Sequence, residues 1–159
     1  MNIRQMKPGD MTRIVAITES AWGDVTVYKL LEDRYGPIGR KGWKQKKADE
    51  VQALFGRISE NVIVAVEDDK VVGYASFTID AEDKVGHVHD NAVDPEYQGR
   101  GIGSAMNKWV LDHFGREGVK IARVSTLLHD KAARRVYEKN GFEELARTIH
   151  YSMRISENQ

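Results

Sequence analysis

The sequence predicts a single α/β domain, a mostly antiparallel mixed sheet that contains one central parallel strand pair and is flanked by helices. Three observations support this fold class. Several segments of strand length are β-branched and apolar, such as residues 61–67. Other segments repeat apolar residues at helical spacing. A strand, a helix and a further strand follow one another from residue 85 onward, which implies a parallel pair joined by a right-handed crossover.

Length and composition restrict the possible functions. The chain has 159 residues, the size of one domain, and its 24 basic and 24 acidic side chains cancel. This balance argues against nucleic acid or an anionic membrane as a partner. No apolar run approaches the ~20 residues of a membrane span, and no signal-peptide core is visible, so we expect a cytoplasmic protein. The absence of cysteine excludes disulfides, thiolate metal sites and an acyl-cysteine intermediate, and we predict no metal site.

The first half of the chain is expected to form seven elements. These are a strand over residues 2–6, helices over 10–22, 25–35 and 43–59, and strands over 61–67, 71–79 and 85–93. Asp10 is placed to cap the first helix. The basic residues at the start of the third helix favour a solvated face, with attraction of acidic substrates as the alternative; they are Arg40, Lys41, Lys44, Lys46 and Lys47.

The second half is expected to complete the sheet. We predict a helix that begins at Ile102 and ends near Gly115, a strand over residues 120–128, and a helix over 130–140. Residues 142–155 are expected to add one or two final strands. The domain therefore covers residues 1–155, and residues 156–159 are expected to form a frayed end.

A glycine-rich loop separates the strand over 85–93 from the next helix. Gly99, Gly101 and Gly103 stand within five residues, and glycine lets a ligand approach the main chain closely. The helix that follows offers free N–H groups and a positive dipole end. This pattern indicates an anion cradle, with a ligand-free turn as the alternative. A nucleotide-binding domain is disfavoured because the spacing is not G-x-G-x-x-G and no P-loop lysine follows.

Two motifs carry a resemblance to a known family. Gln98, Gly101 and Gly103 occupy the defining positions of R/Q-x-x-G-x-G/A, motif A of the GCN5-related N-acetyltransferase (GNAT) family. Residues 130–142 are similar to its motif B, N-x-x-A-x-x-x-Y-E-K-x-G-F, with Asp130 in place of the usual asparagine. The order of elements matches over nearly the whole chain. The resemblance therefore disfavours a turn without a ligand.

The resemblance implies that acetyl-CoA is the co-substrate and that its acetyl group passes to a primary amine by direct attack in a ternary complex. The expected cofactor-binding residues are Asn91, Ala92, Val93, Gln98, Gly99, Arg100, Gly101, Ile102, Gly103, Ser104, Asp130, Ala133 and Tyr137. An ionised Asp130 only accepts hydrogen bonds and would repel a diphosphate, so its alternative role is to cap the helix that it precedes.

The resemblance also implies three catalytic roles. The Val93 N–H polarises the thioester carbonyl, and Tyr137 stabilises or protonates the leaving thiolate, with a core tyrosine as the alternative. His87 and His89 are two residues apart and are predicted to share the strand face of Asn91 and Val93. Histidine titrates near neutral pH, and the pair is similar to that of arylalkylamine N-acetyltransferases, which removes the amine proton through water. The alternative is that both are polar surface residues.

The acceptor is expected to enter over Trp22 to Trp43, because in this fold the first two helices and their connection form the acceptor wall. A small-molecule amine, a protein N-terminus and a lysine side chain all remain open, and so does a homodimer. A non-catalytic acyl-CoA sensor or interaction module is the alternative function.

Overall fold

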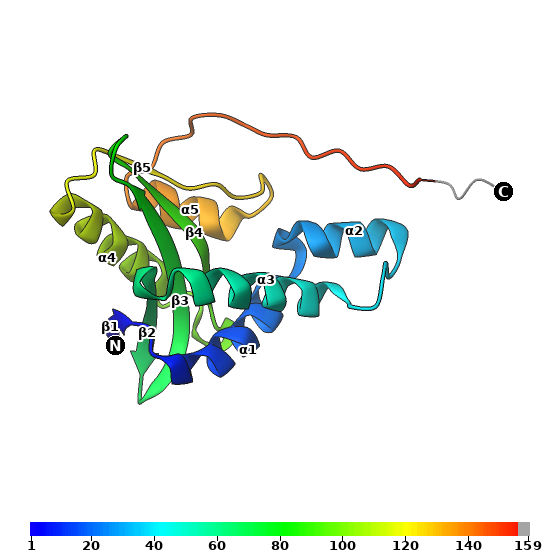
Figure 1. The fold of residues 1–159 in the computed structure, drawn as a ribbon, viewed down its shortest axis with the longest axis horizontal. Coiled ribbons are helices and arrows are strands. Elements are labelled where there is room, and N and C mark those ends of the chain that lie inside the picture. Colours follow the sequence, from blue (N-terminus) through cyan, green and yellow to red (C-terminus); the bar gives the residue numbers. More distant parts are fainter. Residues whose placement is uncertain (156–159) are drawn as a thin grey trace.

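The computed structural model describes residues 1–155 and contains a five-stranded sheet flanked by helices (Figure 1). The strands, in spatial order, are β1 (Asn2–Gln5), β2 (Val62–Glu67), β3 (Lys70–Asp80), β4 (Val85–Val93) and β5 (Ile121–Arg123). All neighbours are antiparallel except β4 and β5, which are parallel. The predicted fold class is confirmed.

Helices cover both faces of this sheet. They are α1 (Met11–Ala21), α2 (Val27–Tyr35), α3 (Trp43–Arg57), α4 (Ile102–Arg116) and α5 (Lys131–Lys139), with short 3₁₀ turns at Pro8–Asp10, Gly23–Val25, Ser59–Asn61 and Pro95–Tyr97. Helices α1 and α3 pack together on one face, and α2 extends beyond them; α4 covers the other face beside α5 (Figure 1). We call these the α1–α3 layer and the α4–α5 layer.

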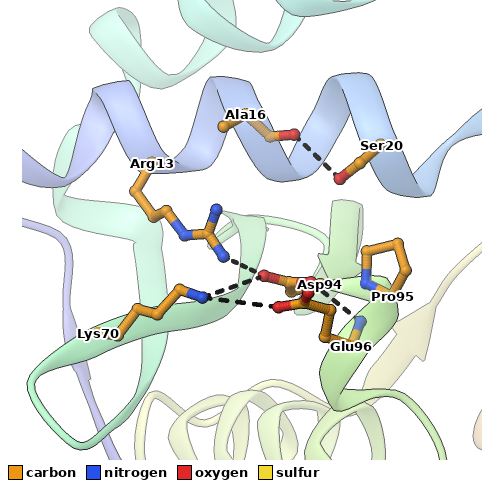
Figure 2. A pocket seen from close by; sticks show the side chains of 7 residues that line it. All are labelled: Arg13, Ala16, Ser20, Lys70, Asp94, Pro95 and Glu96. Carbon is orange, nitrogen blue, oxygen red and sulfur yellow. Dashed lines mark hydrogen bonds and ion pairs between the residues drawn. The ribbon is translucent and has the colours of Figure 1, made fainter.

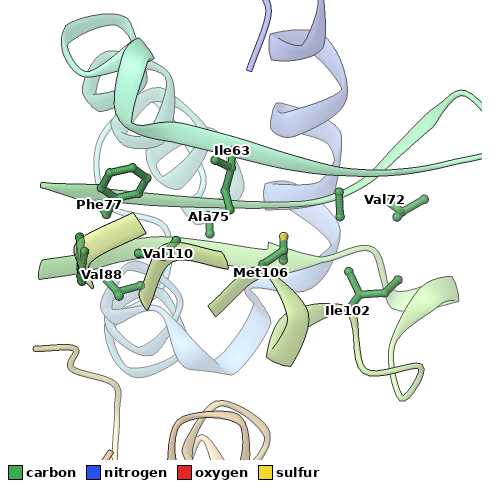
Figure 3. Close-up of a cluster of buried hydrophobic side chains, with 10 residues drawn as sticks. Ile63, Val72, Ala75, Phe77, Val88, Ile102, Met106 and Val110 are labelled. Carbon is green, nitrogen blue, oxygen red and sulfur yellow. The ribbon is translucent and has the colours of Figure 1, made fainter. Parts of the chain in front are cut away.

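Each face of the sheet has its own apolar core. Ile102, Met106, Val110 and Phe114 recur every four residues on α4 and are buried against the sheet. Figure 3 shows most of this cluster, which also contains Ile63, Ala65, Val72, Ala75, Phe77 and Val88. The second cluster joins α1 and α3 to the sheet and consists of Ile14, Ile17, Val51, Phe55, Val62, Val64, Val71 and Tyr74. The helices are therefore fixed on both sides of β4.

A bulge in β4 changes which side chains share a face. Ala75 of β3 pairs with Asn91, but Phe77 pairs with Val88, so β3 advances two residues while β4 advances three. Asn91 and Val88 face the α4–α5 layer, as do Ala75 and Phe77, the β3 residues opposite them. His87 and His89 face the α1–α3 layer. The two histidines share a face as predicted. The prediction that this face is also that of Asn91 and Val93 is wrong, because the bulge interrupts the alternation between them.

The parallel pair is short. β5 pairs with β4 only through Val85–His87, so the strand predicted over residues 120–128 is reduced to three residues. Within residues 1–155, the β4 edge from Val88 to Val93 faces no strand. The two strands thus separate toward the carboxyl end of β4, where the glycine loop begins.

Two further predictions are corrected by the structure. Residues 142–155 run as an extended chain without any assigned strand, so the parallel pair lies at one side of the described sheet rather than at its centre. Alternating side chains favour an extended backbone, but a strand also needs a neighbour for its ladder of hydrogen bonds. The Asp10 carboxylate does not cap α1; it accepts hydrogen bonds from Arg4 and from the Lys7 N–H. The end predicted at residues 156–159 lies outside the described residues.

We expect Gly86→Ala to destabilise the fold by about 1–3 kcal/mol, because the new Cβ would lie 2.5 Å from the buried Phe114 ring. Gly56→Ala is the matched control. Gly56 lies inside α3 with nothing within 4 Å of an added Cβ, so that change should stabilise by about 0.5–1 kcal/mol. Urea unfolding of the two variants measures both effects, and equal stabilities would contradict the packing described here.

Candidate active site

The glycine loop presents bare main chain at the start of α4. Gly99 and Gly101 have φ angles of 77° and 81°, in the left-handed region that favours glycine. Gly101 occupies the N-cap position of α4, and no side chain caps the helix. The N–H groups of the first turn, from Ile102 to Ser104, therefore remain free for an anion. This geometry fits a diphosphate, and it supports the anion-cradle interpretation of the loop.

Side chains beside the loop hold it without covering it. Gln98 Nε2 donates to the Val93 carbonyl at 3.1 Å. Asn140, the residue directly after α5, donates from its Nδ2 to Ser104 Oγ at 3.0 Å. Arg100 donates to the Glu96 carbonyl and lies over the Tyr97 ring. Its guanidinium is thus held against the Pro95–Tyr97 turn. The predicted loop residues are brought together around the end of β4.

Asp94 anchors the turn that leads into the loop. Its buried carboxylate accepts a hydrogen bond from Arg13 of α1 and another, at 3.0 Å, from the Glu96 N–H, with Lys70 Nζ at 4.0 Å (Figure 2). These groups line a hollow of about 360 Å³ together with Ala16, Ser20 and Pro95. Acidic and basic groups pair across this hollow, so it serves to fix the turn. Arg13 has no signal in the sequence pattern, because its partner Asp94 lies 81 residues away.

The open edge of β4 directs main-chain donors into the gap between β4 and β5. The Asp94 N–H donates to the Val72 carbonyl at 2.9 Å, which makes Val93 and Gly73 a non-hydrogen-bonded pair. The Val93 N–H therefore points away from β3, and the alternation gives Asn91 the same direction. Ala92 is turned toward β3 opposite Tyr74. Val93 is thus placed to donate a hydrogen bond to a carbonyl oxygen in the gap.

Tyr137 of α5 joins this side of β4. Its hydroxyl accepts a hydrogen bond from Asn91 Nδ2 at 3.1 Å, and the side chain is buried. Burial raises the pKa of Tyr137, the hydrogen bond from Asn91 opposes this, and Asp130 and Asp90 raise it further. The phenol is therefore protonated at neutral pH and can supply a proton. The ring also packs against Phe142, so it has a core role as well.

Asp130 is engaged within the chain. Its carboxylate accepts from the Ala133 N–H and from Thr126 Oγ1, each at 3.0 Å. The bond from the Ala133 N–H makes Asp130 the N-cap of α5, the alternative role considered for it from the sequence.

The two histidines lie on the α1–α3 face of β4. Their rings are stacked with centroids 6.1 Å apart, and His89 Nε2 is 2.7 Å from Thr78 Oγ1. Burial lowers the pKa of His89, a charge on His87 lowers it further, and Asp90 opposes both effects. His89 is therefore neutral at pH 7 and able to accept a proton. It lies on the side of β4 opposite to Tyr137.

A buried lysine fixes the α1–α3 layer against the β4 bulge. Lys47 Nζ lies 2.6 Å from carboxylate oxygens of both Asp90 and Glu50, and 3.9 Å from the centroid of the Trp22 ring. Trp22 Nε1 in turn donates to the Tyr74 hydroxyl at 2.8 Å. The predicted solvated face is therefore wrong for Lys47, since a lysine can be buried where acidic partners meet it. Helical periodicity gives no signal for such a distant partner.

Residues 1–155 contain neither a group of side chains suited to a metal ion nor a membrane-spanning helix. No group of three or more His, Asp or Glu side chains there could hold a metal ion. No helix in this part of the chain is long and apolar enough to cross a membrane.

Comparisons with known proteins identify the family. The acetyltransferase (GNAT) family matches residues 25–142, which cover most of the sheet, the glycine loop and α5. The chain belongs to this family. It is thus an acyltransferase of the N-acetyltransferase type, as the two motifs predicted.

Relatives of full length agree with this assignment. The chain is 24% identical to the uncharacterized N-acetyltransferase YhfO of Bacillus subtilis, over 98% of both proteins. It is 32% identical to an uncharacterized N-acetyltransferase of Archaeoglobus fulgidus, over 86% of this chain and 89% of that one. The crystal structure of the PaiA N-acetyltransferase from Thermoplasma acidophilum in complex with coenzyme A has the same fold, with a TM-score of 0.68 over 89% of each chain at 16% identity.

Proposed function

We propose that the protein transfers the acetyl group of acetyl-CoA to a primary amine by direct attack in a ternary complex. The observation that carries this proposal is the gap beside β4, where the uncapped start of α4, the Val93 N–H and Tyr137 lie along one edge. The coenzyme A bound to the Thermoplasma acidophilum relative supports the choice of co-substrate. We further propose that the reaction takes place in the cytoplasm.

The cradle residues would hold the diphosphate through main-chain N–H groups. Those of Gly101 to Ser104 give the loop its affinity for anions, and Gln98, Gly99 and Arg100 shape its entrance. Asn91, Ala92 and Val93 border the gap in which the thioester would lie, and Ala133 follows on α5. Asp130 contributes indirectly by capping α5. Acetyl-CoA supplies an acetyl group activated as a thioester.

Three protein groups would serve the transfer. As the amine nitrogen bonds to the thioester carbon, the Val93 N–H stabilises the oxyanion. The carbon–sulfur bond then breaks, and Tyr137 donates its proton to the thiolate. His89, assisted by His87, takes the proton of the amine through water. The chain has no cysteine that could form an acyl-enzyme, which agrees with direct attack.

Under this proposal, the two substrates approach from opposite sides of β4. Tyr137 and the cradle lie in the α4–α5 layer, whereas His89 faces the α1–α3 layer, together with Trp22 and Lys47. An amine that approaches from the second side meets the base before it reaches the thioester. We propose a small-molecule amine, a protein N-terminus or a lysine side chain as the acceptor.

A non-catalytic acyl-CoA sensor is the second candidate, because the glycine loop could bind acyl-CoA without any catalysis. The hydrogen bond between Asn91 and Tyr137 favours the enzyme, since it holds a protonated phenol at the open edge of β4. Release of coenzyme A from acetyl-CoA in the presence of a panel of amines and N-terminal peptides separates the two. A sensor would be stabilised thermally by the coenzyme but would release none above the background rate.

We expect Gly103→Glu to weaken coenzyme A binding at least about 10-fold more than Gly103→Gln. An added Cβ at this position has only ordinary contacts, with Val136 at 3.7 Å and Val93 at 3.8 Å, so both variants should fold. The glutamate alone places a negative charge beside the free N–H groups. Calorimetric titration measures the difference, and equal affinities of the two variants would remove the diphosphate from this loop.

We expect Tyr137→Phe to lower turnover by about 10²-fold and to change coenzyme A affinity little, because the ring keeps its packing while the proton donor is lost. The matched control is Tyr151→Phe, which removes an exposed phenol from the C-terminal segment. Steady-state kinetics with the best amine of the panel measures the effect. Unchanged turnover would restrict Tyr137 to packing.

We expect the acid limb of the kcat/KM profile to lie below pH 6.5, the ordinary value for histidine, because the folded protein lowers the pKa of His89. Activity falls as His89 becomes protonated. His87→Gln removes a charge that lowers the pKa of His89, so the acid limb should move to higher pH. His89→Gln should abolish the acid limb. A limb that stays in place in both variants would assign proton removal to water.

A further inference from the structure

A hydrogen bond joins the two layers beyond the edge of the sheet. His129 Nε2 donates to the main-chain carbonyl of Asp24 at 2.7 Å, between residues 105 positions apart. His129 lies in the loop over residues 124–130, between β5 and α5, and Asp24 lies in the 3₁₀ turn Gly23–Val25, between α1 and α2. The loop reaches toward this turn in Figure 1. We call this hydrogen bond the clasp.

Each partner of the clasp is fixed by its own layer. Trp22 directly precedes the turn, and its Nε1 donates to the Tyr74 hydroxyl at 2.8 Å. On the other side, the Lys131 N–H donates to the His129 carbonyl at 2.9 Å, which ties the loop to the first turn of α5. The same helix carries Tyr137. The clasp therefore joins two segments that are held independently of it.

The clasp closes a circuit around the gap beside β4. Tyr74 is paired with Ala92 of β4, and the neighbouring Asn91 donates to the Tyr137 hydroxyl at 3.1 Å. The two sides of the circuit thus start from adjacent residues of one strand and meet again at the clasp. Elements on opposite faces of a sheet can touch only around its edge, and the β4 edge from Val88 to Val93 faces no strand of the described chain. The clasp therefore lies across this gap from the strand.

We propose that the clasp selects the acceptor by its shape, favouring a primary amine on an unbranched CH₂ arm over an amine whose adjacent carbon carries a second substituent. This inference rests on the proposed function, in which the amine passes from the α1–α3 side of β4 to a thioester on the other side. An unbranched arm, such as that of a lysine side chain or a simple alkylamine, passes while the clasp is closed. A branched amine, such as most protein N-termini, passes only when the clasp opens.

The strength of the clasp sets the size of this preference. His129 and Asp24 are both exposed, and a hydrogen bond in contact with water contributes only a small net free energy. The other links of the circuit involve the buried side chains of Tyr74 and Tyr137, so the clasp is the link that opens first. The need to open it should reduce the rate with a branched amine by about 3- to 10-fold.

Chemical bridging tests whether the clasp exists in solution, independent of acetyl transfer. The chain has no cysteine, so Asp24→Cys with His129→Cys supplies two thiols at the clasp. Dibromobimane, which becomes fluorescent when it joins two neighbouring thiols, should bridge this pair within one chain. The control, Asp24→Cys with Asp112→Cys, has its second thiol exposed on α4 and should not be bridged. Failure to bridge the first pair, with both thiols reactive toward a maleimide, would overturn the proposal.

Steady-state kinetics tests the selection with the best unbranched amine of the panel and its α-methyl homologue. His129→Ala should raise kcat/KM for the α-methyl amine relative to the unbranched one by about 3- to 10-fold, because the clasp no longer has to open. His129→Gln keeps an N–H that can donate to the same carbonyl and should retain the wild-type ratio. The control His150→Ala, in the exposed C-terminal segment, should also retain it. The bridged variant should acetylate the unbranched amine and not its homologue.

The outcomes separate this selection from acetyl transfer itself. An unchanged ratio in His129→Ala, or a bridged variant that retains both amines or loses both, would overturn the selection and leave the proposed function standing. Failure of every amine in the panel to release coenzyme A would instead refute the proposed function, and the selection with it.

Discussion

The bulge in β4 is the constraint on which the site depends. A regular strand would place His87, His89, Asn91 and Val93 on one face, and the two halves of the reaction would compete for the same side of the sheet. The additional residue between Val88 and Asn91 turns the histidines to one layer and Asn91 to the other. Under the proposed function, one strand can therefore serve two substrates from opposite sides.

The two layers around this strand are built differently. On the α4–α5 side the groups proposed to bind the ligand are main-chain N–H groups at an uncapped helix start, and side chains stay at the margin. On the α1–α3 side, side chains form a buried network around Lys47, Asp90 and Trp22. A site made of main chain tolerates changes of sequence that preserve the turn, whereas a wall made of side chains changes with every substitution.

The sequence was sufficient to predict features that depend on neighbouring residues. The glycines of the loop predicted the exposed main chain at the start of α4, and the strand and helix patterns predicted nearly every element before residue 142. It was insufficient where the outcome depends on residues far apart in the chain. The β4 bulge is defined by pairing with β3, and the burial of Lys47 depends on Asp90, 43 residues away. The prediction of one or two strands after residue 142 was wrong, because alternation around Ile149 predicts an extended backbone but does not supply a neighbouring strand.

Asp94 connects the two sides of the molecule directly. Its carboxylate binds Arg13 of α1 and at the same time starts the turn that carries the glycine loop. A ligand that shifted α1 would therefore also shift the loop, and linkage would require a ligand of the loop to change the affinity for the first ligand by the same factor. An ion pair one residue away from Val93 thus connects the position of α1 to the geometry of the loop.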